Sequence, residues 1–155
     1  MITFTCKSFA DLTVYELYDL LKLRQQVFAV EQNCVYLDVD GRDPYGLHCL
    51  GKNEEQELVA YTRLLPMDVP YPGYVSIGRV VTAAAARGGG LGRQLMHYSL
   101  AQIEAHFGQQ PIKIGAQIYL LDFYKSLGFE PFGAPYLDDG IEHIKMILLP
   151  TPHNQ

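Results

Sequence analysis

The chain has 155 residues, 48% of them hydrophobic, which is enough for one globular domain with a buried core. Its formal net charge of −5 argues against a nucleic-acid or anionic-membrane partner, so an anionic ligand would need a local basic patch such as Arg87, Arg93 and Lys125. No apolar run approaches the ~20 residues of a transmembrane helix, no secretory signal pattern is present, and three cysteines without metal-like spacing suit a reducing compartment; we therefore expect a cytoplasmic protein.

The N-terminal part predicts a strand followed by an amphipathic helix. Residues 1–6 alternate loosely between apolar and polar, as a strand does. Thr13 and Glu16 match a capping box, and apolar residues then recur at helical spacing as far as Phe28. Arg24 lies on the same stripe, where we expect its stem to pack and its charged head to reach water; pairing with an internal carboxylate is the less favoured alternative.

An acidic, aromatic loop follows between residues 31 and 46. It contains Asp38, Asp40 and Asp43, for which we expect a solvated turn or an acidic rim that faces a substrate. The spacing Asp38-x-Asp40-Gly41 is similar to part of a calcium loop. The bidentate glutamate that such a loop requires downstream is missing, so calcium is not expected.

The rest of the chain alternates strands and helices. Residues 47–52 and 58–65 predict an antiparallel hairpin around a polar turn. The further predicted elements are strands at 74–82, 111–116, 129–133 and 141–149 and helices at 91–107 and 119–127. Arg79 is expected to pack or to pair with a carboxylate such as Glu31 or Asp40. The element order predicts a mixed α/β single domain.

A glycine-rich stretch, Arg87 to Gly92, lies between a predicted strand and a predicted helix. The unpaired N–H groups and the dipole of a helix N-terminus favour an anion such as phosphate, and glycine lets the backbone approach a ligand. A flexible connection is the alternative, but Arg87 and Arg93 at the two ends favour anion binding. A P-loop does not fit because the Gly-Lys-Ser/Thr ending is absent, and a dinucleotide site fits poorly because the strand at 111–116 carries no acidic residue.

Two motifs together resemble one superfamily. Arg87-x-x-Gly90-x-Gly92 resembles motif A of the GNAT acyl-CoA-dependent N-acyltransferases, and Phe123-Tyr124-Lys125-Ser126-Leu127-Gly128-Phe129 is similar to their motif B. The order and separation of the elements also match that family. The run Ala83 to Ala86 departs from the more usual proline and polar residues of the strand-to-loop segment. In the N-terminal half, the segments 23–28, 30–32 and 38–43 together with His48 are similar to the ElaA-type subfamily.

The resemblance implies one acetyltransferase domain over residues 1–155, with a mixed, mostly antiparallel sheet, a splayed parallel central strand pair and flanking helices. It implies acetyl-CoA as the acyl donor, no metal, and direct transfer of the acetyl group to an amine. A homodimer is the family-level expectation. The implied cofactor-binding residues are Val80, Val81, Thr82, Arg87, Gly88, Gly89, Gly90, Leu91, Gly92, Arg93, Gln117 and Tyr124.

The catalytic residues implied by the resemblance are an acid and a base. A phenol stays protonated at neutral pH, so Tyr124 can donate a proton to the departing thiolate. The acceptor ammonium must first lose a proton, and Glu31, His48 and His143 are the candidate bases. A non-catalytic acyl-CoA sensor is the alternative function, against which the presence of Tyr124 argues.

Overall fold

The computed structural model describes residues 1–151 as eight strands, three α-helices and several short helical turns. The strands are β1 (Thr3–Ser8), β2 (Leu47–Lys52), β3 (Leu58–Leu65), β4 (Ser76–Thr82), β5 (Ile112–Gln117), β6 (Glu130–Pro131), β7 (Tyr136–Asp138) and β8 (Ile141–Leu148). The helices are α1 (Val14–Arg24), α2 (Leu91–Phe107) and α3 (Leu121–Ser126), with a π-helical segment η2 (Gln25–Glu31) and a one-turn helix η3 (Asp43–Tyr45). No helix within residues 1–151 has the length and apolar character needed to cross a bilayer.

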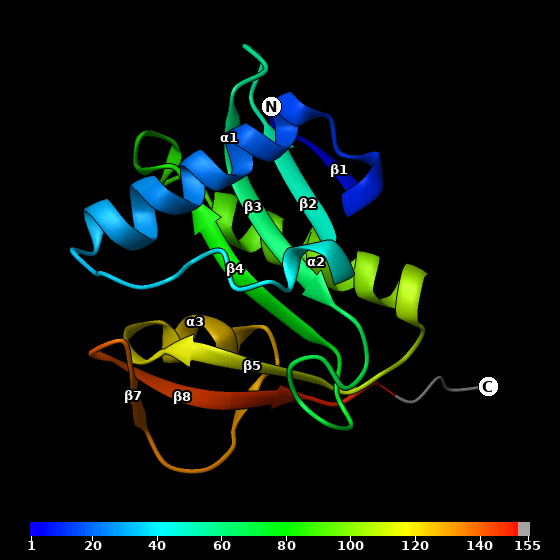
Figure 1. Cartoon of the computed structure of the whole chain (residues 1–155). Coiled ribbons are helices and arrows are strands. Elements are labelled where there is room, and N and C mark those ends of the chain that lie inside the picture. The colour runs from blue at the N-terminus through cyan, green and yellow to red at the C-terminus, as the bar shows by residue number, and fades with distance from the viewer. Residues whose placement is uncertain (152–155) are drawn as a thin grey trace.

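The strands form two antiparallel sheets. One has the order β1-β2-β3-β4, and the other has the order β5-β8-β6 with β7 also paired to β8. The sheets meet at a single parallel bridge between Val75 and Ile112, after which β4 and β5 diverge (Figure 1). The expected parallel central pair is therefore not a paired ladder, because β4 and β5 each belong to a different antiparallel sheet.

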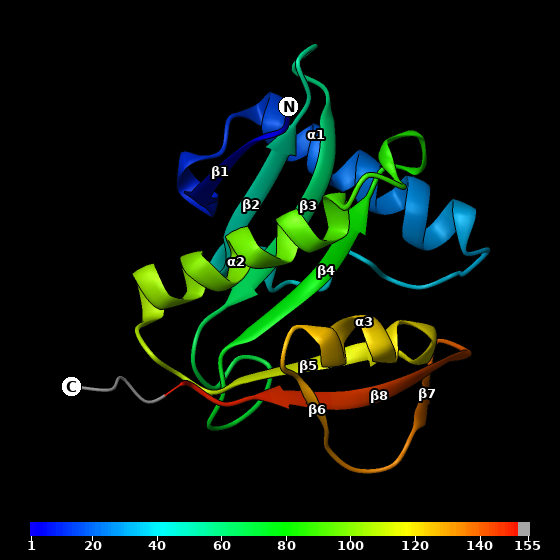
Figure 2. The same cartoon turned by 180° about the vertical axis from the view of Figure 1, so that it is seen from behind.

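Helices cover the first sheet on both faces. Helix α1 and η2 lie on one face and α2 lies on the other, while α3 lies against the second sheet on the same side as α2 (Figures 1 and 2). The core that joins the two sheets is centred on buried side chains that include Val75, Met96, Tyr124, Phe129 and Met146. The core therefore packs the two sheets and the helices α2 and α3 against one another.

Helix α1 begins with the predicted capping box. Thr13 Oγ1 accepts a hydrogen bond from the Glu16 N–H at 3.0 Å, and the Glu16 carboxylate accepts one from the Thr13 N–H at 2.9 Å. The helical path continues to Glu31, beyond the predicted end at Phe28, but it changes to π geometry after Arg24. Such π-helical segments inside α-helices are frequent at functional sites.

The C-terminal strands differ from the prediction. The strand expected over residues 129–133 is reduced to Glu130–Pro131, because proline lacks the N–H that a longer ladder would need. The three-residue strand β7 was not predicted, since a segment of that length has no measurable periodicity. It pairs with the beginning of β8 and places Tyr136 opposite His143.

Replacing Thr13 by alanine should lower the free energy of unfolding by about 1 kcal/mol, because the first turn of α1 loses its cap. Thr13→Ser keeps the hydroxyl and should stay close to the parent protein. Urea unfolding of the three proteins measures the difference, and equal midpoints for Thr13→Ala and Thr13→Ser would show that the cap contributes nothing.

Candidate active site

A cavity of about 590 Å³ opens where β4 and β5 diverge. Elements from both halves of the chain line it, namely η2, β4, β5, α3 and β8. The sequence-predicted residues that it brings together are Glu31, Val80, Val81, Thr82, Arg87, Gly92, Gln117, Tyr124 and His143. The candidate base His48 does not line the cavity, and neither do Gly88, Gly89, Gly90, Leu91 and Arg93, which continue the glycine loop beyond its rim.

The glycine loop presents free backbone donors. Within residues 1–151, the N–H groups of Gly88 through Arg93 donate to no protein acceptor, and the first bond of α2 runs from the Gln94 N–H to the Gly90 carbonyl. Gly88 and Gly90 have positive φ angles of 101° and 78°, and no atom lies within 4 Å of the place that a Cβ would take. Leu91 turns its side chain into the core, so it contributes only backbone. The loop can therefore bind an anion through these N–H donors.

Two arginines hold the ends of this loop. The Arg87 guanidinium donates to the Thr82 carbonyl at 2.9 Å and forms an ion pair of 2.7 Å with Glu31. Arg93 donates to the Ser126 hydroxyl at 2.9 Å and lies over the Phe123 ring. Each arginine thus ties the loop to a neighbouring element and adds positive charge beside the free N–H groups.

Strand β4 contains a bulge at the cavity. Arg63 pairs with Gly78 and Tyr61 pairs with Val81, so β4 has one residue more than β3 over this interval. Arg79 lies within the bulge at a φ of 50°, an unusual value for a residue with a side chain. The bulge removes backbone groups of β4 from the ladder and leaves them available at the cavity wall.

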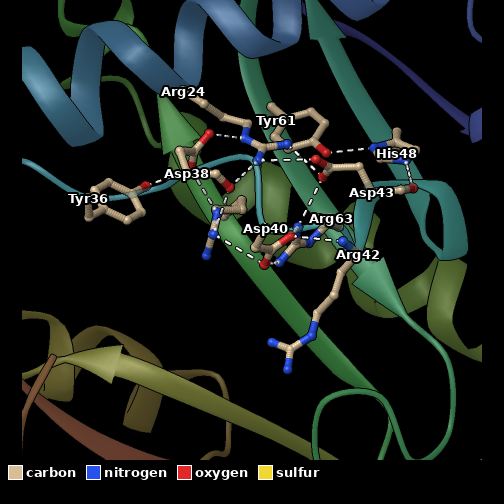
Figure 3. Close-up of polar contacts among 10 residues, drawn as sticks. Arg24, Tyr36, Asp38, Asp40, Arg42, Asp43, His48, Tyr61 and Arg63 are labelled. Atoms are coloured by element: carbon tan, nitrogen blue, oxygen red, sulfur yellow. Dashed lines mark hydrogen bonds and ion pairs between the residues drawn. The ribbon is translucent and has the colours of Figure 1, made fainter. Parts of the chain in front are cut away.

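The acidic loop is neutralised by buried arginines. Arg24 has no exposed surface, and it forms ion pairs with Asp38 at 2.7 Å and Asp43 at 2.8 Å (Figure 3). The expectation that its head reaches water was wrong, and so was the expectation that Asp38 and Asp43 lie in a solvated turn or acidic rim. A fully buried guanidinium needs acceptors at close range, and these carboxylates supply them.

The same cluster extends to β3 and β4. Arg63, on β3, binds both oxygens of Asp40 at 2.8 and 2.9 Å, and its Nη1 lies 3.0 Å from Asp43. Arg79, in the bulge, pairs with Asp38 at 2.8 Å and with Asp40 at 3.3 Å. The predicted pairing of Arg79 with Asp40 is confirmed. We call the six residues Arg24, Asp38, Asp40, Asp43, Arg63 and Arg79 the ionic cluster.

The contacts in the cluster shift the pKa values of Asp40, Asp43 and Arg24. Burial acts to raise the pKa of Asp40 and of Asp43, but hydrogen bonds and charge from Arg63 and Arg24 outweigh it, so both pKa values are lowered. Against the effect of its burial, the pKa of Arg24 is raised by its hydrogen bond to Asp43 and by the nearby charges, Asp38 among them. All of these groups are therefore charged at neutral pH.

His48 is part of the core and not a base for an acceptor. Its Nε2 lies 2.9 Å from the Asp43 carbonyl, which can only accept, so Nε2 carries the proton and Nδ1 accepts from the Tyr61 hydroxyl at 2.6 Å. Burial lowers the pKa of His48 further. Both ring nitrogens are occupied, which removes His48 from the candidate bases.

Tyr124 and His143 both line the cavity. Tyr124 is 5% exposed and is packed edge-to-face between Phe123 and Phe129, and no described residue hydrogen-bonds its hydroxyl. Burial raises its pKa, so the hydroxyl keeps its proton. The His143 Nδ1 lies 2.7 Å from the Ile141 carbonyl, which fixes the proton of the neutral ring on Nδ1 and leaves the Nε2 lone pair free.

Gln117 is hydrogen-bonded to Gln32, a residue that was not predicted to belong to the site. Its side-chain amide forms a reciprocal pair with that of Gln32 at 3.1 and 3.3 Å, joining the end of β5 to the end of η2. Arg42, Arg63 and Lys145, which also line the cavity, were missed as well. Of these, only Arg63 carried an indication in the sequence, since a charge inside a long apolar strand needs a buried partner.

The fold and the loop-and-tyrosine arrangement define an acyltransferase of the GNAT class, and comparison with known proteins agrees. The sequence model of the Acetyltransferase (GNAT) domain matches residues 45–150. The chain belongs to this family. The ElaA protein of Escherichia coli is 47% identical over 140 residues, which cover 88% of this chain and 90% of ElaA.

Solved structures give the same result. The crystal structure of E. coli ElaA superposes with a TM-score of 0.88 at 43% identity, over 96% of this chain and 99% of that chain. An acyl-CoA N-acyltransferase from Pseudomonas aeruginosa superposes with a TM-score of 0.90 at 44% identity and the same coverage. A GNAT acetyltransferase from Elizabethkingia anophelis, solved with acetyl-CoA bound, shares the fold over 96% of this chain and 97% of its own, with a TM-score of 0.66 at 16% identity. The sequence-based resemblance to the GNAT and ElaA-type proteins is confirmed.

Replacing Arg24 by methionine should destabilise the protein by about 3–5 kcal/mol, because two buried carboxylates lose a partner. Lys22→Met, at an exposed position on the same helix, is the matched control and should leave the unfolding midpoint in urea nearly unchanged. A loss for Arg24→Met no larger than that of the control would contradict a structural role for the ionic cluster.

The contribution of the cluster should depend on pH. Because Arg24 lowers the folded-state pKa of Asp43, the stabilisation from this pair is present above the unfolded-state pKa of about 3.9 and is lost as pH falls below it. The difference in unfolding free energy between the parent protein and Arg24→Met should therefore be constant between about pH 5 and pH 7 and shrink below about pH 4. A difference that grows on acidification would contradict this sign.

Proposed function

We propose that this protein transfers the acetyl group of acetyl-CoA directly to an amine. The observation that carries the proposal is a single cavity that joins an anion-binding loop, a bulged strand, a protonated tyrosine and a histidine with a free lone pair. A second cavity, lined mainly by α2, the loop that follows it and residues 148–151, contains none of these groups.

The glycine loop and the diverging strands β4 and β5 support the binding of the acyl donor, acetyl-CoA. The free N–H groups of Gly88 through Arg93 fit the pyrophosphate of CoA, since no Cβ obstructs Gly88 to Gly90 and Arg87 lies beside them. The gap between β4 and β5 exposes the edge of β4 at Val80 to Thr82, along which an extended pantetheine arm can pair as an added strand. The acetyl-CoA-bound relative from E. anophelis supports the same use of this fold.

In this proposal, the thioester carbonyl reacts beside the bulge of β4. There an unpaired N–H can donate to the thioester carbonyl oxygen as negative charge develops on it. The amine nitrogen attacks the carbonyl carbon, the C–N bond forms and the C–S bond breaks. Tyr124 donates its proton to the departing sulfur, consistent with its raised pKa.

The base is His143 rather than Glu31 in this proposal. His143 Nε2 is free to take the proton that the acceptor ammonium must lose. The Glu31 carboxylate already pairs with Arg87 beside the glycine loop, where it organises the donor half. The acetyl-CoA in turn contacts the part of the cavity wall that is formed by Val80, Val81, Thr82 and Gln117.

Acetyl-CoA should raise the melting temperature of the protein, whereas ATP and NAD should not, because a ligand that binds the native state stabilises it. Tyr124→Phe removes only the hydroxyl, so it should keep the acetyl-CoA shift and lower kcat by about 10²- to 10⁴-fold in a thiol-release assay with an amine panel. Lost acetyl-CoA binding in Tyr124→Phe would make the residue structural. Acetyl-CoA binding without thiol release for any amine would indicate a sensor.

His143→Gln should lower kcat by about 10²- to 10⁴-fold while acetyl-CoA binding persists. Glu31→Gln should instead weaken acetyl-CoA binding and leave kcat at saturation little changed, because Arg87 loses its partner. His97→Gln, exposed on α2, is the control for a histidine outside the cavity. A reversed pattern, with kcat lost in Glu31→Gln and kept in His143→Gln, would assign the base to Glu31.

A further inference from the structure

The charges that line the cavity are not all paired within the protein. The Arg79 and Arg63 guanidinium groups face Asp38, Asp40 and Asp43, and Arg87 faces Glu31. Once these pairs cancel, the cationic side chains left without a carboxylate are Arg42 and Lys145. Both line the cavity of a protein whose net charge is −5, so they provide local positive charge in a molecule that is negative overall.

Arg42 presents its guanidinium away from the ionic cluster. Its backbone N–H donates to Asp40 at 3.0 Å, while Figure 3 shows its side chain pointing away from the aspartates. No described residue accepts a hydrogen bond from that guanidinium. The loop that carries Arg42 crosses the face of the sheet opposite α2, the helix whose N-terminus would bind CoA (Figures 1 and 2). Arg42 is therefore on the acceptor side of the cavity.

Lys145 is held in place by tyrosines and not by an acid. Its Nζ donates to the Tyr71 hydroxyl at 3.0 Å and lies 4.7 Å from the Tyr71 ring centre and 4.4 Å from that of Tyr136. Although burial acts to lower its pKa, contacts with the two hydroxyls raise it, so the amine stays charged. Arg63, on β3, also lines the cavity, and it adds a buried donor because its Nε has no acceptor among the described residues and its side chain is 3% exposed.

Two acidic residues lie just before β8, the strand that carries Lys145. Asp138 and Asp139, at the turn between β7 and β8, also line the cavity, and neither forms an ion pair within residues 1–151. His143 lies between this turn and Lys145 on β8. Residues 143 and 145 both face the cavity, and two steps along a strand separate their Cα atoms by about 7 Å.

From this arrangement we propose that the acceptor is an amine that also bears a carboxylate on the same short molecule. The carboxylate binds Arg42 and Lys145, and the amine reaches His143 beside the acidic turn. A dipeptide carries both groups on one short chain, because each residue spans at most about 3.3–3.6 Å. This inference rests on the proposed acetyl transfer and names the class of substrate for it.

The test compares acceptors that differ only in charge. Glycylglycine, glycylglycinamide and 1,4-diaminobutane are assayed by thiol release at saturating acetyl-CoA, and their binding to the CoA-loaded protein is measured by calorimetry. We expect kcat/KM to be about 10- to 100-fold higher for glycylglycine than for its amide, because the amide loses charge-assisted hydrogen bonds. Arg42→Gln should remove that preference through KM, while Lys22→Gln, outside the cavity, should keep it.

The outcomes separate the two proposals. Equal or better turnover of the amide or the diamine, unaffected by Arg42→Gln, would overturn the carboxylate site and leave acetyl transfer standing. If no acceptor is acetylated, binding decides, and failure of glycylglycine to bind the CoA-loaded protein more tightly than its amide also overturns the site. Absence of any melting shift with acetyl-CoA would instead overturn the proposed function.

Discussion

The ionic cluster is the interaction on which the site depends. Arg24 reaches it from α1, Arg63 from β3 and Arg79 from β4, and all three meet carboxylates supplied by one loop. A buried charge without a partner is costly, so the loop between η2 and β2 cannot leave the sheet without exposing or stranding several charges at once. The loop is thereby fixed across the face of β4, where it forms one wall of the cavity.

The cluster also holds the bulge of β4. Arg79 has a positive φ that a non-glycine residue adopts at a cost, and its guanidinium is clamped by Asp38 and Asp40 and lies over the Tyr36 ring. The same residues thus stabilise the loop and keep backbone groups of β4 out of the ladder. Stability and chemistry are coupled here, because the strained segment is the one that faces the proposed reacting carbonyl.

Prediction from sequence succeeded where the determinants are local. The Thr13 capping box, the 47–65 hairpin and the glycine loop before α2 each depend on a few neighbouring residues, and the structure contains all of them. Arg24 and the aspartates were mispredicted because their burial depends on partners that are 14 or more residues away in the sequence, and no local pattern reveals such partners. His48 was offered as a base for the same reason, since only the fold shows that Tyr61 and the Asp43 carbonyl occupy its ring nitrogens.

In the proposed complex, the free N–H groups of Gly88 through Arg93 bind the pyrophosphate of acetyl-CoA while the β4 bulge meets the acyl group. Residue-resolved amide hydrogen exchange tests this most directly, because unpaired amides exchange fast until a ligand accepts their hydrogen bonds. With acetyl-CoA, we expect slowed exchange of the amide hydrogens at residues 88–93 and at Arg79 to Val81, with little change at the distant strand β1. Unchanged exchange in the glycine loop under conditions where acetyl-CoA is bound would contradict it.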